Sequence, residues 1–162
     1  MFQNLILNNP TGKKVLVLFD MDGTCVEYGC GEKKQILDNV PGYFYNKRPI
    51  YTVIDIMKQL NDTENITVGI LSNCYYKEQK QDKIKWLKEN LPFIKDENIH
   101  INVYSDEVYN DENKHQIKAK KIISLNLQKD QMVYLIEDDH QVISATNKIM
   151  PNTAFHISCL LK

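Results

Sequence analysis

Short apolar runs alternate with longer amphipathic segments along the chain, and this alternation limits the fold more than any other feature. The clearest run is Val-Leu-Val-Leu-Phe at residues 15–19, which is followed shortly by an Asp-Gly turn sequence. A continuous apolar run of this kind is typical of a strand that is buried on both faces. Similar runs at residues 66–71, 99–103 and 132–136, and a weaker one at 153–157, predict further strands.

Four amphipathic segments lie between these strands, at residues 50–60, 77–90, 111–125 and 140–149. Their apolar side chains recur at helical spacing. Strands separated by helices form βαβ units, whose right-handed crossovers build a parallel sheet that is covered on both faces. We therefore predict a doubly wound parallel α/β fold, in which an active site lies beyond the carboxyl ends of the strands.

The length and composition suit one domain over residues 1–162. Of these residues 43% are hydrophobic and 25% are charged, and no linker or repeat divides the chain. The 20 basic and 21 acidic residues leave no positive excess for an extended nucleic-acid surface. A small phosphorylated substrate, such as a nucleotide, could still bind in a local pocket.

The N-terminal sequence and the cysteines favour a cytoplasmic protein that does not associate with membranes. The apolar stretch at residues 5–7 is too short for a signal peptide or a membrane span. Cys25, Cys30, Cys74 and Cys159 lack paired metal-ligand spacing, so we expect free thiols rather than a zinc or redox site. The sequence leaves the oligomeric state open.

Two acidic clusters follow two of the predicted strands. Asp20 and Asp22 come directly after the first strand, and Gly23 allows the chain to turn sharply there. The run Glu137-Asp138-Asp139 follows the fourth strand. Either cluster alone could be an ordinary acidic loop or a polar helix start. Together at one edge of a sheet they would repel one another, and a hard divalent cation such as Mg²⁺ would relieve this repulsion.

Polar and basic side chains near the same edge could bind phosphate. Ser72 and Asn73 follow the second strand and could donate to phosphate oxygens, although both residue types are also common helix N-caps. A cation must also neutralise phosphate during its transfer. Among the lysines of residues 113–121 we place Lys114 first, because it is nearest the expected helix start, followed by Lys118 and Lys121.

These residues, in this order, resemble the four motifs of the haloacid-dehalogenase superfamily over residues 15–140. The matching features are Asp20-x-Asp22-Gly-Thr24 after an apolar strand, Ser72 after the next, a lysine, and Glu137-Asp138-Asp139. The resemblance implies a Rossmann-like core and a magnesium-dependent phosphatase.

The same resemblance implies a role for each matching residue. Asp20 would attack phosphorus and form an aspartyl-phosphate, while Asp22 would act as general acid and base. Asp20, Asp138 and the backbone carbonyl of Asp22 would hold Mg²⁺. Ser72 and the lysine would hold the phosphate, and Thr24 would support the loop. Glu137 or Asp139 would act behind the metal ligands or on metal-bound water.

A further likeness concerns bacterial relatives of the 5'(3')-deoxyribonucleotidases. It rests on Pro41-Gly-Tyr-Phe, on Pro49 before a helix, and on the Lys85-Trp86-Leu87 helix that ends before Pro92. In such enzymes a cap chooses the substrate, but here residues 25–45 leave room only for a small lid or none. Tyr43, Phe44 and Tyr45 could stack on a base or simply pack, and we expect Trp86 in the core.

Several functions therefore stay open at this stage. The leading hypothesis is hydrolysis of a phosphomonoester, with a nucleotide as one candidate substrate. Phosphoryl transfer to another acceptor and phosphatase action on a polynucleotide end are alternatives. The non-enzymatic alternative is a phosphate- or metal-binding protein with the same fold. The acid Asp22 next to the proposed nucleophile Asp20 argues against this alternative, because a binding protein does not need it.

Overall fold

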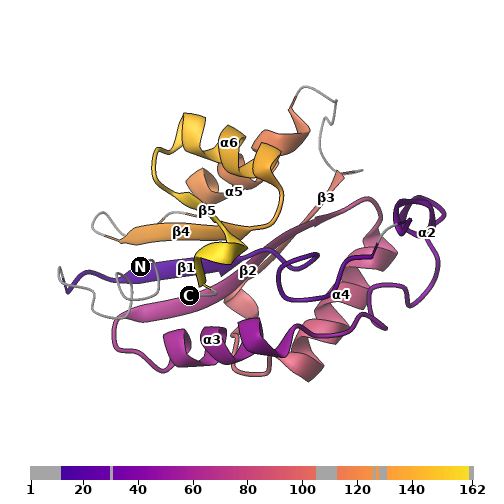
Figure 1. The fold of residues 1–162 in the computed structure, drawn as a ribbon, viewed down its shortest axis with the longest axis horizontal. Coiled ribbons are helices and arrows are strands. Elements are labelled where there is room, and N and C mark those ends of the chain that lie inside the picture. Colours follow the sequence, from indigo (N-terminus) through magenta and orange to yellow (C-terminus); the bar gives the residue numbers. More distant parts are fainter. Residues whose placement is uncertain (1–11, 30, 105–112, 126, 128–130, 161–162) are drawn as a thin grey trace.

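One sheet of five parallel strands organises the molecule (Figure 1). The computed structural model describes residues 12–29, 31–104, 113–125, 127 and 131–160. The strands lie in the order β3-β2-β1-β4-β5, and all neighbours run parallel. Their bounds are Val15–Phe19 (β1), Ile66–Cys74 (β2), Ile99–Val103 (β3), Met132–Glu137 (β4) and Ala154–His156 (β5). The five predicted strands are therefore confirmed, with the fifth shorter than expected.

Helices cover both faces of this sheet, which confirms the doubly wound α/β fold (Figure 1). The helices α3 (Tyr51–Asn61) and α4 (Lys77–Asn90) pack on one face, and α5 (Ile117–Ser124) and α6 (His140–Ile149) pack on the other. Short 3₁₀ turns, η1 (Asp96–Asn98), η3 (Lys114–Gln116) and η4 (Ile157–Leu160), complete the connections. The predicted helix at 111–125 is thus shorter: η3 precedes α5, and residues 111–112 lie outside the described part.

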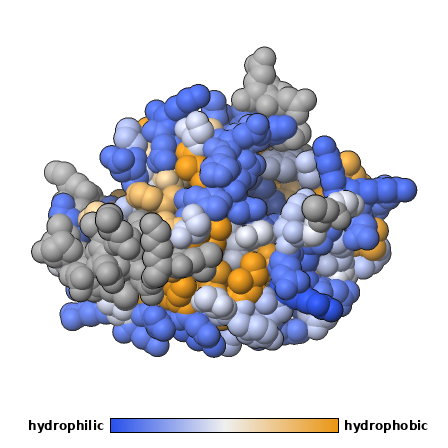
Figure 2. Space-filling model, viewed as in Figure 1, coloured by the Kyte–Doolittle hydropathy of each residue, from blue (hydrophilic) through white to orange (hydrophobic). Residues whose placement is uncertain are grey.

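Alternating side chains of β1 belong to two hydrophobic clusters, one on each face of the sheet. Val15, Val17 and Phe19 join the larger cluster with α3 and α4, which includes Trp86, as expected. Leu16 and Leu18 join the smaller cluster under α5 and α6. Both faces of β1 are covered, so every side chain of this strand is buried, which explains why its sequence is a continuous apolar run. In Figure 2 the helices present mainly hydrophilic residues to solvent, and hydrophobic ones show chiefly between them.

The insert after β1, residues 25–45, is named the lid; that it covers a substrate stays a prediction. In the described part of residues 25–45 the one helix is α2 (Lys33–Leu37). Two hydrogen bonds dock it on the start of α4: Gln79 Nε2 donates to Ile36 O at 2.6 Å, and the Tyr76 hydroxyl donates to Leu37 O at 3.2 Å. The lid is therefore fixed to the helix that follows β2.

The lid's aromatic side chains pack within the protein. Tyr43 donates to Glu32 and meets Phe44 edge to face at 4.9 Å, while the Tyr45 hydroxyl donates to Glu89 at 2.9 Å. Since Phe44 is only 2% exposed, the packing interpretation of these three rings is the better supported one.

Cys25, Cys74 and Cys159 are free thiols in the structure, and Cys30 lies outside the described residues. Cys25 is buried beneath the loop that follows β1, and its thiol donates to Asp20 O at 3.0 Å. Burial raises the pKa of this thiol, and the negative charge of Asp20 raises it further. Within the described part of the chain, no helix has the length and apolarity needed to cross a bilayer.

Candidate active site

The ends of β1 and β4 lie side by side at the carboxyl edge of the sheet. Phe19 pairs with Ile136 in the parallel register, so the next residues, Asp20 and Glu137, are neighbours. The backbone N–H of Asp20 donates to Ile136 O at 2.8 Å, which continues the ladder by one residue. The two acidic clusters of the sequence therefore meet at the place where doubly wound folds bind ligands.

Three carboxylates gather at this edge. One oxygen each of Asp20, Glu137 and Asp138 lie within 4.8 Å of one another. Asp20 is 5% exposed and Glu137 is 1% exposed. Burial raises the pKa of Asp138, and the Asp20 charge adds to this effect. The same two causes raise the pKa of Glu137 to about 8. Such crowding disfavours the charged forms, so a cation at this cluster would stabilise them.

Lys118 supplies one positive charge to this cluster. Its Nζ lies 2.6 Å from Asp20 Oδ1 and 2.5 Å from Glu137 Oε2, and its side chain is 4% exposed. Burial opposes the charged ammonium, but the two carboxylates outweigh burial and raise the pKa of Lys118. One ammonium does not balance three carboxylates.

A divalent cation suits this donor set. Mg²⁺ prefers carboxylate and other oxygen ligands, and the gathered oxygens of Asp20, Glu137 and Asp138 are of that kind. Both oxygens of Glu137 already have partners, Lys118 at Oε2 and two backbone N–H groups at Oε1, whereas Lys118 contacts Asp20 through Oδ1 only. Asp20 and Asp138 are therefore the carboxylates better placed to hold the ion. A magnesium site at these residues stays a prediction with which the geometry agrees.

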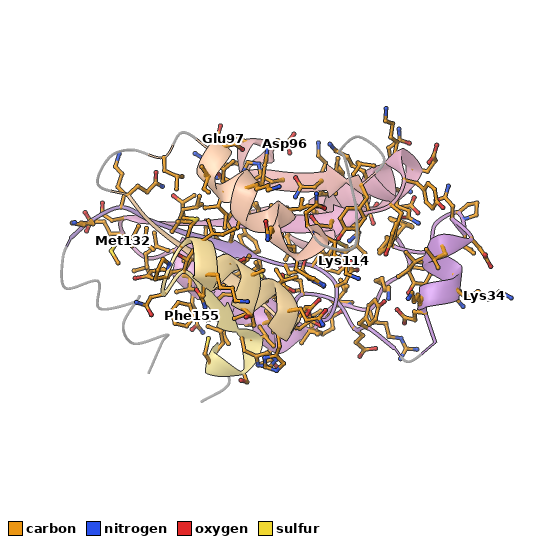
Figure 3. All side chains as sticks on the ribbon, turned by 90° about the horizontal axis from the view of Figure 1, so that it is seen from above. Lys34, Asp96, Glu97, Lys114, Met132 and Phe155 are labelled. Atoms are coloured by element: carbon orange, nitrogen blue, oxygen red, sulfur yellow. The ribbon has the colours of Figure 1, made fainter. Side chains whose placement is uncertain are left out.

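The lysine at this position differs from the one placed first from the sequence. Lys114 lies in η3 (Figure 3), before the first turn of α5. Because the α-helix begins only at Ile117, Lys118 occupies its first turn and reaches the strand ends. The structure thus places Lys118, rather than Lys114, at the acidic cluster; Lys121, the third choice, falls in the last turn of α5. The lysine that binds phosphate stays a prediction, for which this geometry favours Lys118.

A tight turn after β1 carries Asp22 and Gly23. Gly23 has a φ of +77°, which other residues rarely adopt, and a Cβ there would collide with the Asp138 carboxylate. The turn is closed by a hydrogen bond from Gly23 N to Val26 O at 2.9 Å. Thr24 is buried inside it, and its Oγ1 has no hydrogen-bond partner among the described residues. Glycine thus lets the two acidic segments approach each other.

A second buried lysine, which the sequence did not suggest, binds Asp22. Lys83 of α4 is fully buried and forms an ion pair with Asp22 Oδ2. Burial raises the pKa of Asp22, while Lys83 opposes this rise. A signal for Lys83 does exist in the sequence: with Gln79, Trp86 and Leu87 it occupies the helix face that is buried. A lysine at such a position needs a buried partner.

Ser72 and Asn73 lie inside β2 rather than after it, because the strand continues to Cys74, beyond the predicted end at residue 71. Ser72 is fully buried, and its Oγ accepts from Lys83 at 3.0 Å. The Asn73 amide donates to the Tyr104 hydroxyl at 3.2 Å and accepts from Asn102 at 2.9 Å. Asn73 therefore connects β2 to β3, and its binding of phosphate stays a prediction.

The third acid of the run, Asp139, has a structural contact. Its Oδ1 accepts from Gln141 N at 2.7 Å and caps the start of α6. Glu137 instead faces inward, where its Oε1 accepts from the backbone N–H groups of Asp138 and Asp139 at 3.2 Å each. Of the two residues left open by the sequence, Glu137 is the one that shares Lys118 with Asp20, and its role near a metal ion stays a prediction.

A cavity of about 440 Å³ joins these groups. Asp20, Asp22, Ser72 and Lys118 line it together with Asp138. Aromatic side chains complete the wall: Tyr28, Phe44, Tyr75 and Tyr104. Tyr28 is 50% exposed, and Tyr75 meets Tyr104 edge to face at 5.0 Å. The cavity therefore combines a charged floor with an aromatic rim.

The chain matches no protein-family model and no curated protein. Among solved structures it is similar to a chain of the Pnkp1/Rnl/Hen1 complex, with a TM-score of 0.66 and 15% identity over 90% of this chain. A chain of the Pnkp1/Rnl/Hen1 RNA repair complex has a TM-score of 0.60 and 17% identity, again over 90%. The HAD domain of effector protein Lem4 from Legionella pneumophila has a TM-score of 0.48 and 15% sequence identity. This match covers 90% of this chain and 86% of that chain.

The chain spans less than half of the first two structures, 46% and 43% of their lengths. At such low identity the likeness shows a shared fold and nothing finer. The resemblance to deoxyribonucleotidase relatives stays a prediction.

Proposed function

We propose that this protein is a Mg²⁺-dependent phosphomonoester hydrolase that works through a phosphorylated Asp20. The observation that carries this proposal is the grouping of the buried Asp20, Glu137 and Lys118 with the partly buried Asp138 at the carboxyl edge of the sheet. These residues would supply a nucleophile, oxygen ligands for Mg²⁺ and a cation that neutralises phosphate, all at one cavity.

Two chemical steps follow from this arrangement. A carboxylate oxygen of Asp20 forms a bond to phosphorus, the ester P–O bond breaks, and Asp22 gives its proton to the leaving oxygen. Water then attacks phosphorus, Asp22 takes a proton from it, and the Asp20–phosphorus bond breaks to release inorganic phosphate. Burial raises the pKa of Asp22, which is the direction that a general acid needs, while the ion pair with Lys83 opposes this rise.

The remaining groups position the reactants. Lys118 fixes Asp20 through Oδ1 and offers positive charge to the transferring phosphoryl group. Ser72 would hold a phosphate oxygen. Mg²⁺, held by Asp20, Asp138 and the backbone carbonyl of Asp22, would neutralise phosphate charge when bound.

The end of a polynucleotide is the second candidate for the substrate. Two observations favour it over a free mononucleotide. Within the described residues the lid is small, so the rest of a polynucleotide could extend out of the cavity while its end is bound. The similar structures belong to Pnkp1/Rnl/Hen1 complexes, one of them described as an RNA repair complex. The exposed ring of Tyr28 could stack on a terminal base.

The first test is hydrolysis of para-nitrophenyl phosphate with Mg²⁺ and with a chelator. We expect turnover in the presence of Mg²⁺ and none with the chelator. In Asp20→Asn the rate of hydrolysis should fall by at least about 10⁴-fold, since the nucleophile is removed. Asp96→Asn, which alters an exposed acid outside the cavity, is the matched control and should keep its activity. Equal rates for Asp20→Asn and wild type would refute the proposed nucleophile, whereas an inactive wild type that binds phosphate would favour the binding-protein alternative.

A substrate panel then separates the candidates. It comprises mononucleotides, sugar phosphates, and oligonucleotides with 3'- or 5'-terminal phosphates. A kcat/KM at least tenfold higher for one oligonucleotide than for its matching mononucleotide would support action on polynucleotide ends, and the reverse order would favour a nucleotidase.

A further inference from the structure

Lys83 makes an unusual set of contacts inside the proposed active site. Its side chain is fully buried, and its Nζ donates to Asp22 Oδ2, to Ser72 Oγ at 3.0 Å and to the Asn73 carbonyl at 2.9 Å. The Phe44 ring covers the ammonium at 4.4 Å from the ring centroid. One cation thus joins the proposed acid/base to the proposed phosphate-binding hydroxyl.

The contact between Lys83 and Ser72 determines which of the two groups donates the hydrogen bond. An ammonium group has three N–H donors and no acceptor, so the Ser72 oxygen must accept from Lys83. The hydroxyl proton of Ser72 is then left to donate elsewhere, and the described residues offer it no recorded acceptor. Because Ser72 lines the cavity, this proton is available to a phosphate oxygen.

The contact with Asp22 separates its two oxygens. Lys83 holds Oδ2, while Oδ1 is buried and has no hydrogen-bond partner among the described residues. A buried carboxylate oxygen without a partner is costly, and a ligand can relieve that cost. Asp22 lines the cavity and its side chain is 19% exposed, so the carboxyl group that Lys83 holds through Oδ2 borders the space where the leaving group would lie.

Stability alone does not explain a lysine at this position. Replacing a buried ion pair by apolar residues of similar volume is often neutral or stabilising. The buried neighbours of Lys83 on α4 include Trp86 and Leu87, so an apolar side chain would suit this face of the helix. A functional reason for the charge is therefore worth testing.

We propose that Lys83 is a positioning residue, which holds the Asp22 carboxyl group in place for the leaving oxygen and orients the Ser72 hydroxyl toward the phosphate. This role rests on the proposed function, and it assigns Lys83 to the protonation of the leaving group rather than to the attack on phosphorus. Lys118, on the opposite face of the sheet, serves the nucleophile.

The test compares two substrates that differ in their need for an acid. Phenyl phosphate releases a poor leaving group, whereas para-nitrophenyl phosphate releases a good one that needs little protonation. We expect Lys83→Met to lower kcat about 100-fold or more for phenyl phosphate and about tenfold for para-nitrophenyl phosphate, because general acid catalysis contributes about 10²–10⁴-fold. A role in packing alone would lower both rates by the same factor.

Lys88→Met is the matched control. It makes the same substitution on the same helix at a side chain that is 54% exposed, so both rates should stay within about twofold of wild type. Thermal unfolding of each variant measures folding separately. If Lys83→Met does not yield folded protein, Lys83→Gln, which keeps a neutral donor, takes its place with the same ratio of rates as the readout.

The link to Ser72 has its own measurement. In a double-mutant cycle, Ser72→Ala should cost less in the Lys83→Met background than in wild type, because the hydroxyl is no longer oriented. Equal losses for the two substrates together with additive effects in the cycle would overturn the role of Lys83. A wild type that hydrolyses neither substrate would overturn the proposed function, and the role of Lys83 with it.

Discussion

The two buried lysines of the cavity, Lys118 and Lys83, differ in what they bind. Lys118 comes from α5 and bridges two carboxylates, Asp20 and Glu137. Lys83 comes from α4, on the other face of the sheet, and binds one carboxylate, Asp22, together with a hydroxyl and a carbonyl oxygen. Lys118 therefore compensates charge, whereas Lys83 also orients neutral groups.

The difference indicates a division of the site by sheet face. The side of α5 and β4 holds the proposed nucleophile and the proposed metal ligands. The side of α4, β2 and the lid holds the acid/base and the hydroxyl, under the cover of Phe44. Substitutions on the first side should affect every substrate alike, and those on the second side should affect substrates according to their leaving groups.

Lys118→Met should have the largest effect. It leaves Asp20 and Glu137 buried without their cation, so we expect kcat/KM to fall about 10³-fold, by the same factor for both phenyl phosphates. Removing one partner of a buried ion pair typically costs about 3–5 kcal/mol, so the midpoint of thermal unfolding should also fall.

The exposed Lys120 on the same helix provides the control, and Lys120→Met should change neither quantity. The division by sheet face would be wrong if Lys118→Met slowed phenyl phosphate much more than para-nitrophenyl phosphate, since that pattern is expected of Lys83.

Glu137→Gln should have an intermediate effect. The amide keeps the volume and an oxygen for the N–H groups of Asp138 and Asp139, but it removes the charge that Lys118 binds. Partners behind metal ligands usually contribute about 10- to 100-fold to metal affinity or activity. We expect the Mg²⁺ concentration for half-maximal rate to rise by such a factor, with the ratio of the two substrate rates unchanged. A changed ratio at saturating Mg²⁺ would contradict this assignment.

The contrast between the lysines also shows how far the sequence could predict the site. The continuous apolar runs predicted every strand, and parallel pairing of β1 with β4 then required Asp20 and Glu137 to meet. The choice of Lys118 depended on where the α-helix begins, and a 3₁₀ turn moved that start to Ile117. Local periodicity does not fix such a boundary.

Lys83 was missed for a different reason. It lies 61 residues from Asp22 along the chain. It also belongs to a helix that is rich in charged residues, where a further lysine gives no sign that it is buried. Only its place on the buried face, beside Gln79 and Trp86, marked it as different. Contacts between distant elements of this kind follow from packing, which the pattern of one segment does not describe.

Phe44→Leu should have the smallest effect and tests the second side of the site most selectively. The ring covers the Lys83 ammonium at 4.4 Å, and such a cation–π contact contributes about 0.5–1 kcal/mol at exposed sites and more where it is desolvated. Without the ring we expect Lys83 to hold Asp22 less firmly, so the rate for phenyl phosphate should fall about two- to fivefold relative to that for para-nitrophenyl phosphate. Phe93→Leu makes the same change in a ring that packs against the core near the start of β2, and it should leave the ratio unaltered. An unchanged ratio in both variants would mean that Lys83 keeps its position without Phe44, and a shift in the Mg²⁺ requirement of Phe44→Leu would contradict the separation of the two sides.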